Sequence, residues 1–147
     1  MKQWTMLLAG VLMLAAGGAA EAKRPTQMSE LPATAQQFVR DNFADGRVTH
    51  VKMAGRLADR DYEVAFVDGT RIQFDKNGNW EEIHTHYGKI PATVLPQKAR
   101  TYLREHYPEV PMTAVEHDRK GYEIELSNGL ELEFGPDGTL LSGHRIL

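Results

Sequence analysis

The sequence contains no cysteine, and serine occurs only as Ser29, Ser127 and Ser142. Without cysteine the chain has no disulfide, no thiol nucleophile and no cysteine-linked lipid anchor. None of the three serines lies in a G-x-S-x-G or S-x-x-K motif, and the 13 glycines form no phosphate-binding loop. We therefore predict that the protein is not an enzyme and uses no cofactor.

The chain also lacks an excess of positive charge. Lys and Arg total 17 against 20 Asp and Glu, which gives a net charge of −3 and argues against nucleic acid as a partner. The composition is 41% hydrophobic and 25% charged, as in ordinary globular proteins, so extensive disorder is excluded. The apolar run Met6–Ala16 is shorter than the ~20 residues that a membrane-spanning helix needs.

The first 22 residues have the pattern of a cleavable secretory signal. Lys2 precedes the apolar run, and Ala20-Glu21-Ala22 forms an A-x-A cleavage site. We therefore predict a signal peptide at residues 1–22 and a periplasmic or secreted protein that is not a lipoprotein. No membrane span is expected after cleavage.

Two later segments share one helical pattern, and each opens with a Leu-Pro pair. The spacing of their apolar residues is that of one face of a helix. These residues are Leu31, Ala35, Phe38, Val39 and Phe43 in the first segment, and Leu95, Ala99, Tyr102, Leu103 and Tyr107 in the second.

Four short strands are predicted after each helix, at residues 48–54, 61–67, 70–75 and 79–86, and again at 112–117, 121–127, 130–135 and 139–146. The central strands correspond at an offset of 60 residues, so that Tyr62-Glu63-Val64 matches Tyr122-Glu123-Ile124. We interpret residues 23–88 and 89–147 as two tandem repeats of one helix-plus-four-strand unit.

The alternation of apolar residues also predicts the register of the strands. A three-residue turn at Ser127-Asn128-Gly129 pairs Ile124 with Leu132 and keeps the apolar side chains on one face. A unit of about 60 residues without disulfides is only marginally stable alone. We therefore predict an α+β fold with one eight-stranded antiparallel sheet, both helices packed on one face and the other face open.

Several segments of the two halves together form a recognisable pattern: Leu31-Pro32, YEVAFVDGT at 62–70 and IQFDKNGNW at 72–80, with the looser second copy YEIELSNGLELEFGPDG at 122–138. This pattern resembles the β-lactamase-inhibitor-like, PepSY-like family, which consists of small secreted bacterial proteins with tandem helix-plus-sheet units. The second copy has Gly135 where the first has Asp75, and Leu140 where it has Trp80. The resemblance implies a fold and a secreted location, and it brings no catalytic residues.

Four glutamates are candidate binding residues on the open face. The predicted register sets Glu123 opposite Glu133 and Glu125 opposite Glu131, and like charges in these positions destabilise a sheet. Such a ladder fits a surface that binds a basic protein or a hard cation such as Ca²⁺. A solvated face, with its repulsion screened or offset by basic residues of neighbouring strands, would have the same sequence.

His84 and His86 form an H-x-H pair on a predicted strand, so both side chains should point to one face. Two imidazoles at this spacing can share a zinc ion if a third ligand such as His50 or His117 lies close. Without that ligand they are ordinary surface histidines.

Trp80 and Tyr87 bracket the fourth predicted strand. Exposed aromatic side chains on an open sheet would anchor a protein partner, whereas a buried Trp80 would belong to the core.

The sequence thus favours a non-enzymatic protein-binding module, an inhibitor or escort of an envelope or secreted protein, that uses the open sheet face. The alternative is a periplasmic protein that binds a small ligand or a metal ion, calcium or zinc. The residue pattern predicts neither the identity of the partner nor the oligomeric state.

Overall fold

The structure is a computed structural model that describes residues 23–56 and 58–146. The predicted signal peptide at residues 1–22 lies outside these ranges. Within the described residues, nine strands, two α-helices and two short 3₁₀ helices follow one another along the chain. No helix in this part of the chain is long and apolar enough to cross a membrane.

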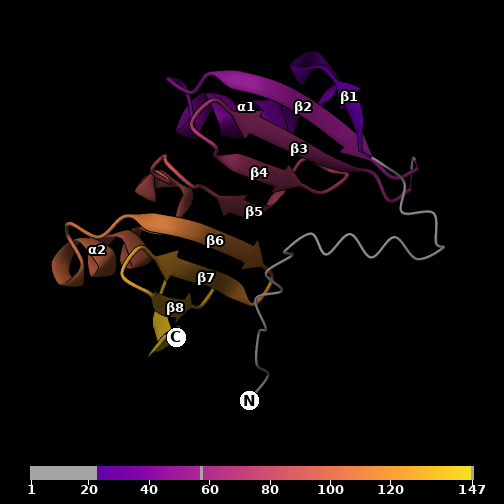
Figure 1. Cartoon of the computed structure of the whole chain (residues 1–147). Coiled ribbons are helices and arrows are strands. Elements are labelled where there is room, and N and C mark those ends of the chain that lie inside the picture. The colour runs from indigo at the N-terminus through magenta and orange to yellow at the C-terminus, as the bar shows by residue number, and fades with distance from the viewer. Residues whose placement is uncertain (1–22, 57, 147) are drawn as a thin grey trace, which may run out of the picture.

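The nine strands form a single antiparallel sheet in which every strand pairs with its neighbours in the chain (Figure 1). Two helices interrupt this order: α1 connects β1 to β2, and α2 connects β5 to β6. The elements are β1 (Arg24–Thr26), η1 (Met28–Glu30), α1 (Ala33–Asn42), β2 (Val48–Ala54), β3 (Asp61–Phe66), β4 (Arg71–Phe74), β5 (Trp80–His84), η2 (Ala92–Val94), α2 (Gln97–His106), β6 (Met112–Asp118), β7 (Gly121–Leu126), β8 (Leu130–Phe134) and β9 (Leu140–Arg145).

The prediction of eight strands was wrong, because the sheet has an additional edge strand, β1. Its three residues pair with β2, and Pro25 lies opposite Lys52. A proline is acceptable on an edge strand because one side of that strand makes no ladder hydrogen bonds. Three residues are too few to show the alternation from which strands are predicted, so β1 gave no sequence signal.

The predicted register of the central strands is confirmed. Ile124 pairs with Leu132 and Glu123 with Glu133, across the three-residue turn that ends at Gly129. Gly129 has a φ of 81°, a conformation that glycine adopts without the steric cost that other residues meet.

The hydrophobic core lies on the face of the sheet opposite the predicted glutamate ladder. Its central residues are fully buried and come from β3 to β8: Val64, Ile72, Phe74, Ile83, Val115, Ile124, Leu132 and Phe134. Both helices contribute to the same cluster. The ring of Phe38 on α1 lies 5.8 Å from that of Phe74, and the ring of Tyr102 on α2 lies 5.7 Å from that of Phe134.

Each helix begins against a tight turn of the sheet. Gly78, between β4 and β5, has a φ of 83°, and a Cβ added there would lie 2.8 Å from the backbone nitrogen of Ala35 on α1. Gly138, between β8 and β9, has a φ of 87°, and its added Cβ would lie 2.9 Å from the nitrogen of Ala99 on α2. Only glycine fits both this conformation and this space. Each turn therefore packs directly against the first turn of its helix.

Candidate functional site

A row of polar side chains crosses the sheet on the face opposite the core, which we call the glutamate face. The strand pairing places one residue of each strand from β2 to β8 in this row: Lys52, Glu63, Gln73, Glu82, Glu116, Glu123 and Glu133. The last four are adjacent across β5 to β8, and we call them the glutamate row. Directly opposed residues of paired strands lie about 4.5–5.5 Å apart, so the four carboxyl groups crowd one another.

The sequence predicted half of the glutamate row. Glu123 and Glu133 lie on two strands joined by a three-residue turn. The length of this turn determines which residues pair, and the predicted pairing is confirmed. Glu82 and Glu116 were missed because they meet through the pairing of β5 with β6. Those strands are separated in the chain by α2, so no turn geometry predicts their register. The sequence did contain one indication for Glu82: it lies two positions from His84 on the same strand, so both side chains point to the same face of the sheet.

A second pair of predicted glutamates lies beside this row. Glu125 is opposite Glu131, as predicted, and on the other side of β8 Glu131 pairs with His144 of β9. The His144 Nε2 lies 3.1 Å from Oε1 of Glu131, and Glu131 is buried whereas His144 is exposed. Burial raises the pKa of Glu131, and the negative charges of Glu133 and Glu125 raise it further. His144 acts in the opposite direction but does not cancel the increase.

Glu123 is the most deeply buried carboxylate of the face, with 1% of its surface exposed. Neither of its side-chain oxygens has a hydrogen-bond partner among the described residues. Burial, reinforced by the charges of Glu131, Glu116 and Glu133, raises the pKa of Glu123 to about 8. At neutral pH and without a cation, this carboxyl therefore holds a proton.

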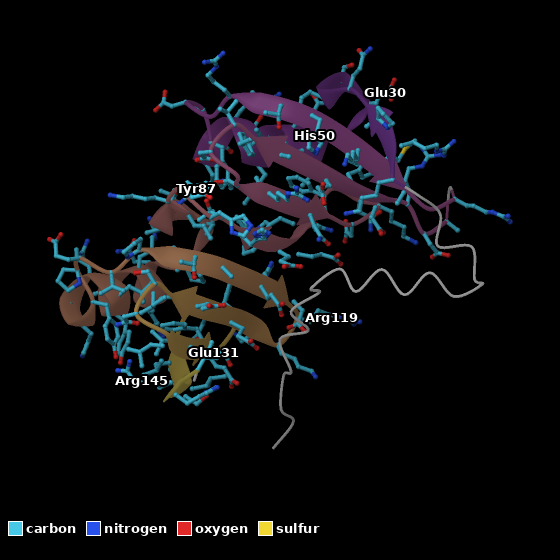
Figure 2. All side chains as sticks on the ribbon, in the orientation of Figure 1. Glu30, His50, Tyr87, Arg119, Glu131 and Arg145 are labelled. Atoms are coloured by element: carbon cyan, nitrogen blue, oxygen red, sulfur yellow. The ribbon has the colours of Figure 1, made fainter. Side chains whose placement is uncertain are left out.

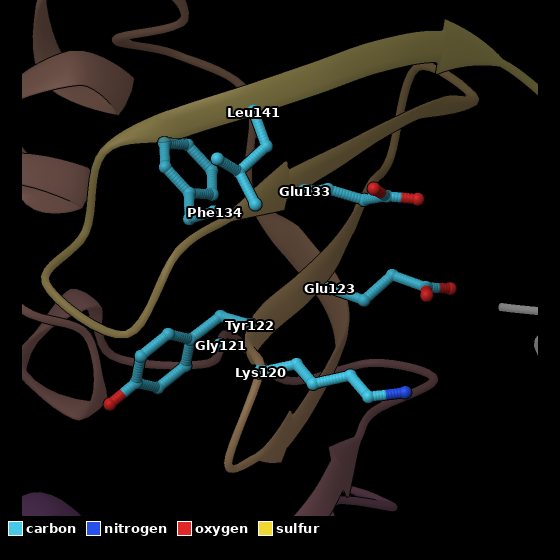
Figure 3. Close-up of a pocket in the computed structure, with 7 residues that line it drawn as sticks. All are labelled: Lys120, Gly121, Tyr122, Glu123, Glu133, Phe134 and Leu141. Carbon is cyan, nitrogen blue, oxygen red and sulfur yellow. The ribbon is translucent and has the colours of Figure 1, made fainter. Parts of the chain in front are cut away.

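Three carboxyl groups converge at this place. Glu123, Glu131 and Glu133 each offer an oxygen such that all three atoms lie within 4.8 Å of one another. Figure 3 shows the side chains of Glu123 and Glu133 extending in the same direction, on the opposite side of the strands from Tyr122 and Phe134. We call these three residues the carboxylate triad.

A pocket of about 270 Å³ borders the triad. It lies where β7 begins and β8 ends, and Figure 3 shows its lining. Glu123 and Glu133 line it together with Lys120, Gly121, Tyr122, Phe134 and Leu141.

Glu63 occupies the position of Glu123 in the first half of the sheet, but its surroundings differ. It is also buried, at 5% exposed, and accepts a hydrogen bond from Lys23 Nζ at 2.7 Å. Arg71 lies 3.8 Å and His50 3.7 Å from its other oxygen. Burial alone would raise the pKa of Glu63, but the Lys23 hydrogen bond and the nearby positive charges outweigh it and lower the pKa.

His84 and His86 lie close together, with ring centroids 5.0 Å apart. Burial lowers the pKa of the half-buried His84, and His86 lies beyond the end of β5. The third ligands considered from the sequence are engaged elsewhere: the His117 ring stacks on Tyr122, and His50 lies beside Glu63. Among the described residues, no group of three metal-ligating side chains includes a histidine.

Trp80 and Tyr87 do not join the glutamates. Trp80 pairs with Phe74 and stacks on Phe38 of α1 at 5.6 Å, which places it on the core side of the sheet. Tyr87 is 91% exposed in the loop after β5, and Figure 2 shows it well separated from Glu131. A role for these two aromatic residues in partner binding stays a prediction.

The fold and the site define a small α+β protein in which one antiparallel sheet carries an acidic patch. The chain belongs to the family described as "Putative beta-lactamase-inhibitor-like, PepSY-like", whose model matches residues 60–142. The resemblance found in the sequence is therefore confirmed.

Three solved structures of similar proteins come from Bacteroides. A "putative calcium-regulated periplasmic protein" of Bacteroides thetaiotaomicron is 34% identical, with a TM-score of 0.76, over 84% of this chain and 97% of its own. A "putative periplasmic protein" of Bacteroides vulgatus is 34% identical, with a TM-score of 0.75, over 86% of this chain and 99% of its own. A second protein of that species is 30% identical, with a TM-score of 0.71, over 83% of this chain and 98% of its own.

The descriptions of these relatives agree on location and name no reaction. All three solved structures are described as periplasmic, and the family is described as inhibitor-like. No curated protein matches the chain. The comparisons therefore show a family of periplasmic or inhibitor-like proteins to which no enzymatic activity is attributed.

Proposed function

We propose that the protein is an exported, non-enzymatic binding module that binds a protein partner through its glutamate face, in the periplasm or outside the cell. The observation that carries this proposal is the glutamate row, four adjacent acidic residues across β5 to β8. A folded protein gains no stability from such a row, because like charges directly opposite one another are unfavourable. The predicted signal peptide and the periplasmic relatives support the location.

We further infer that the two halves are tandem copies of one unit and that both helices cover the same face. The 60-residue offset between the central strands supports the repeat, as do the matching contacts of Gly78 with α1 and Gly138 with α2. In this arrangement the helices occupy the core side and leave the glutamate face available to a partner.

The charge of the face defines the chemistry of that partner. Basic side chains, among them Lys23, Lys52 and Arg71, surround Glu63 on the first half of the face, whereas the glutamate row dominates the second half. A partner with a basic surface patch would complement β5 to β8, and electrostatic complementarity would speed its association and select it against acidic proteins. The inhibitor-like description of the family supports inhibition or escort of an envelope or secreted protein as the outcome.

The experiment compares two double variants with equal charge changes. Glu82→Lys/Glu125→Lys reverses charge on the glutamate face and leaves the carboxylate triad intact. Glu105→Lys/Glu109→Lys reverses two exposed charges at and just beyond the end of α2. Proteins captured from an envelope extract should be retained by the wild type and the α2 variant and lost by the face variant. Capture of the same proteins by all three would refute a role for this face.

Inhibition can be tested directly. If the family description applies to this chain, the protein at micromolar concentration should inhibit a β-lactamase in a hydrolysis assay, and the face variant should not. A lack of inhibition across β-lactamases of different classes would remove that activity and leave the binding role to the capture experiment.

A second candidate function is the binding of a small ligand or a metal ion. The carboxylate triad favours it, and one relative is described as calcium-regulated, which favours calcium over zinc. A titration with Ca²⁺ and with Zn²⁺, followed by thermal unfolding, separates the two ions. If neither ion raises the midpoint of unfolding, the metal-binding role should be abandoned.

A further inference from the structure

We propose that Glu123, Glu131 and Glu133 form a binding site for a divalent metal ion with a preference for oxygen ligands, and that Ca²⁺ is the ion that fits it best. The site gives the metal-binding candidate function a location and a ligand set. It does not depend on a protein partner, so metal binding and partner binding can succeed or fail separately.

The spacing of the triad matches a single ion. Ca²⁺ binds oxygen atoms at about 2.3–2.6 Å, so two ligands of one ion lie at most about 5 Å apart. The three carboxylate oxygens lie within 4.8 Å of one another. Small rotations of the side chains would therefore bring all three onto one ion without movement of the strands.

The burial of Glu123 is an independent indication that a ligand is required. Its side chain is 1% exposed, and both oxygens lack a hydrogen-bond partner among the described residues. Buried polar atoms in folded proteins are almost always paired, because leaving one unpaired costs about 1–3 kcal/mol. A cation held between Glu123 and its two neighbours would satisfy these atoms.

The first half of the sheet shows how the same position is satisfied by the chain itself. Glu63 is buried like Glu123 and occupies the corresponding place in the row. There, the ammonium group of Lys23 lies 2.7 Å from a carboxylate oxygen, and Arg71 lies nearby. Glu123 instead has Glu116 and Glu133 as its row neighbours. We infer that a metal ion supplies to Glu123 the positive charge that Lys23 supplies to Glu63.

The ligand atoms determine which ion is preferred. All three ligands are carboxylates, which suit hard cations, whereas structural zinc sites use sulfur and nitrogen. The triad projects from one face of a sheet, so water must complete the coordination on the other side. Ca²⁺ accepts such irregular, partly hydrated geometry more readily than Mg²⁺, which requires a near-ideal octahedron. With three protein ligands, we expect a dissociation constant of roughly 0.1–1 mM, as in extracellular calcium modules.

The test is calorimetric titration of the chelator-treated protein with Ca²⁺ at pH 7.5, together with thermal unfolding. We expect one site per chain, and a rise in the unfolding midpoint of about 5–10 °C at 10 mM Ca²⁺. Glu123→Gln and Glu133→Gln keep side-chain size and remove a charged ligand, so each should weaken binding at least tenfold. Glu105→Gln, an exposed residue of α2, is the matched control and should bind as the wild type does.

Three results would overturn the proposal. The first is a folded wild type that shows neither binding heat nor a midpoint shift at 10 mM Ca²⁺. The second is equal Ca²⁺ affinity in Glu123→Gln, Glu133→Gln and the wild type. The third is a midpoint shift of the same size from NaCl or spermidine at equal ionic strength, which would show screening of the acidic face and no coordination. Circular dichroism at pH 5 establishes that each variant is folded before the titration.

Discussion

Replacing Glu123 by glutamine should stabilise the metal-free protein at alkaline pH and leave its stability unchanged near pH 4.5. The native protein holds a proton on Glu123 up to a pKa of about 8, whereas the unfolded chain releases it near the ordinary glutamate pKa of 4.5. Between these values, folding takes up a proton. A rise in pH therefore favours the unfolded state, and the free energy of unfolding falls through this window.

The magnitude follows from the size of the pKa change. A shift from 4.5 to about 8 corresponds to a loss of roughly 4–5 kcal/mol when the pH rises across the whole window. This figure is an upper limit, because side-chain movement or entry of water lowers the cost of the charge once it forms. Glutamine carries no charge at any pH in this range, so the variant lacks the loss. At pH 9 it should exceed the wild type by at least 2 kcal/mol.

Other carboxyl groups on the face also contribute to the pH dependence of the wild type. Burial and neighbouring charges raise the pKa of Glu116 on β6 and Glu131 on β8, which act in the same direction as Glu123. The pKa of Glu63 is lowered, so it acts in the opposite direction. The difference between variant and wild type at each pH reports the contribution of Glu123 together with its electrostatic coupling to these neighbours.

The assay is urea unfolding followed by circular dichroism at pH 5, 7 and 9, with a chelator present throughout. Glu105→Gln serves as the control, because Glu105 is exposed on α2 and should show no pH-dependent difference. If Glu123→Gln and the wild type keep the same difference in unfolding free energy from pH 5 to pH 9, the buried, protonated state of Glu123 is refuted.

Three further predictions concern other parts of the molecule. Lys23→Gln removes the 2.7 Å ion pair with Glu63 and should lower stability by about 1 kcal/mol at pH 7, since Lys23 is partly exposed. The loss should disappear in acid once Glu63 is protonated, and urea unfolding at pH 7 and pH 3 checks both values. Ile124→Ala removes a fully buried side chain from β7 and should cost about 2–5 kcal/mol, measured in the same way. Zn²⁺ should leave the unfolding midpoint of wild type and His84→Ala/His86→Ala equally unchanged, because no third ligand joins these histidines among the described residues. A rise that depends on the histidines would show that a zinc site exists there.

The parts of the fold that the sequence predicted are those that short-range geometry determines. The turn at Ser127-Asn128-Gly129 joins two alternating strands, so parity alone sets Glu123 opposite Glu133, and this is confirmed. The pairing of β5 with β6 spans α2, and no local pattern constrains it. For that reason the glutamate row was predicted as an isolated ladder of β7 and β8, without Glu82 and Glu116.

The environment of each buried glutamate could not be predicted because the decisive contacts are distant in the sequence. Glu63 and Glu123 have similar neighbours on their own strands, a tyrosine before and a β-branched aliphatic residue after: Tyr62 with Val64 and Tyr122 with Ile124. The residue that separates their chemistry is Lys23, which lies 40 positions before Glu63 and directly precedes the unpredicted strand β1.

This difference explains why one half of the face is a candidate metal site and the other is not. Pairing of β1 with β2 holds the chain before the first helix beside the sheet, and Lys23 reaches Glu63 from there. The segment before α2 follows β5 and leads through η2 to the helix, and among the described residues it supplies no partner to Glu123. Lys23 therefore neutralises the first glutamate, and the second is left to take its positive charge from solution.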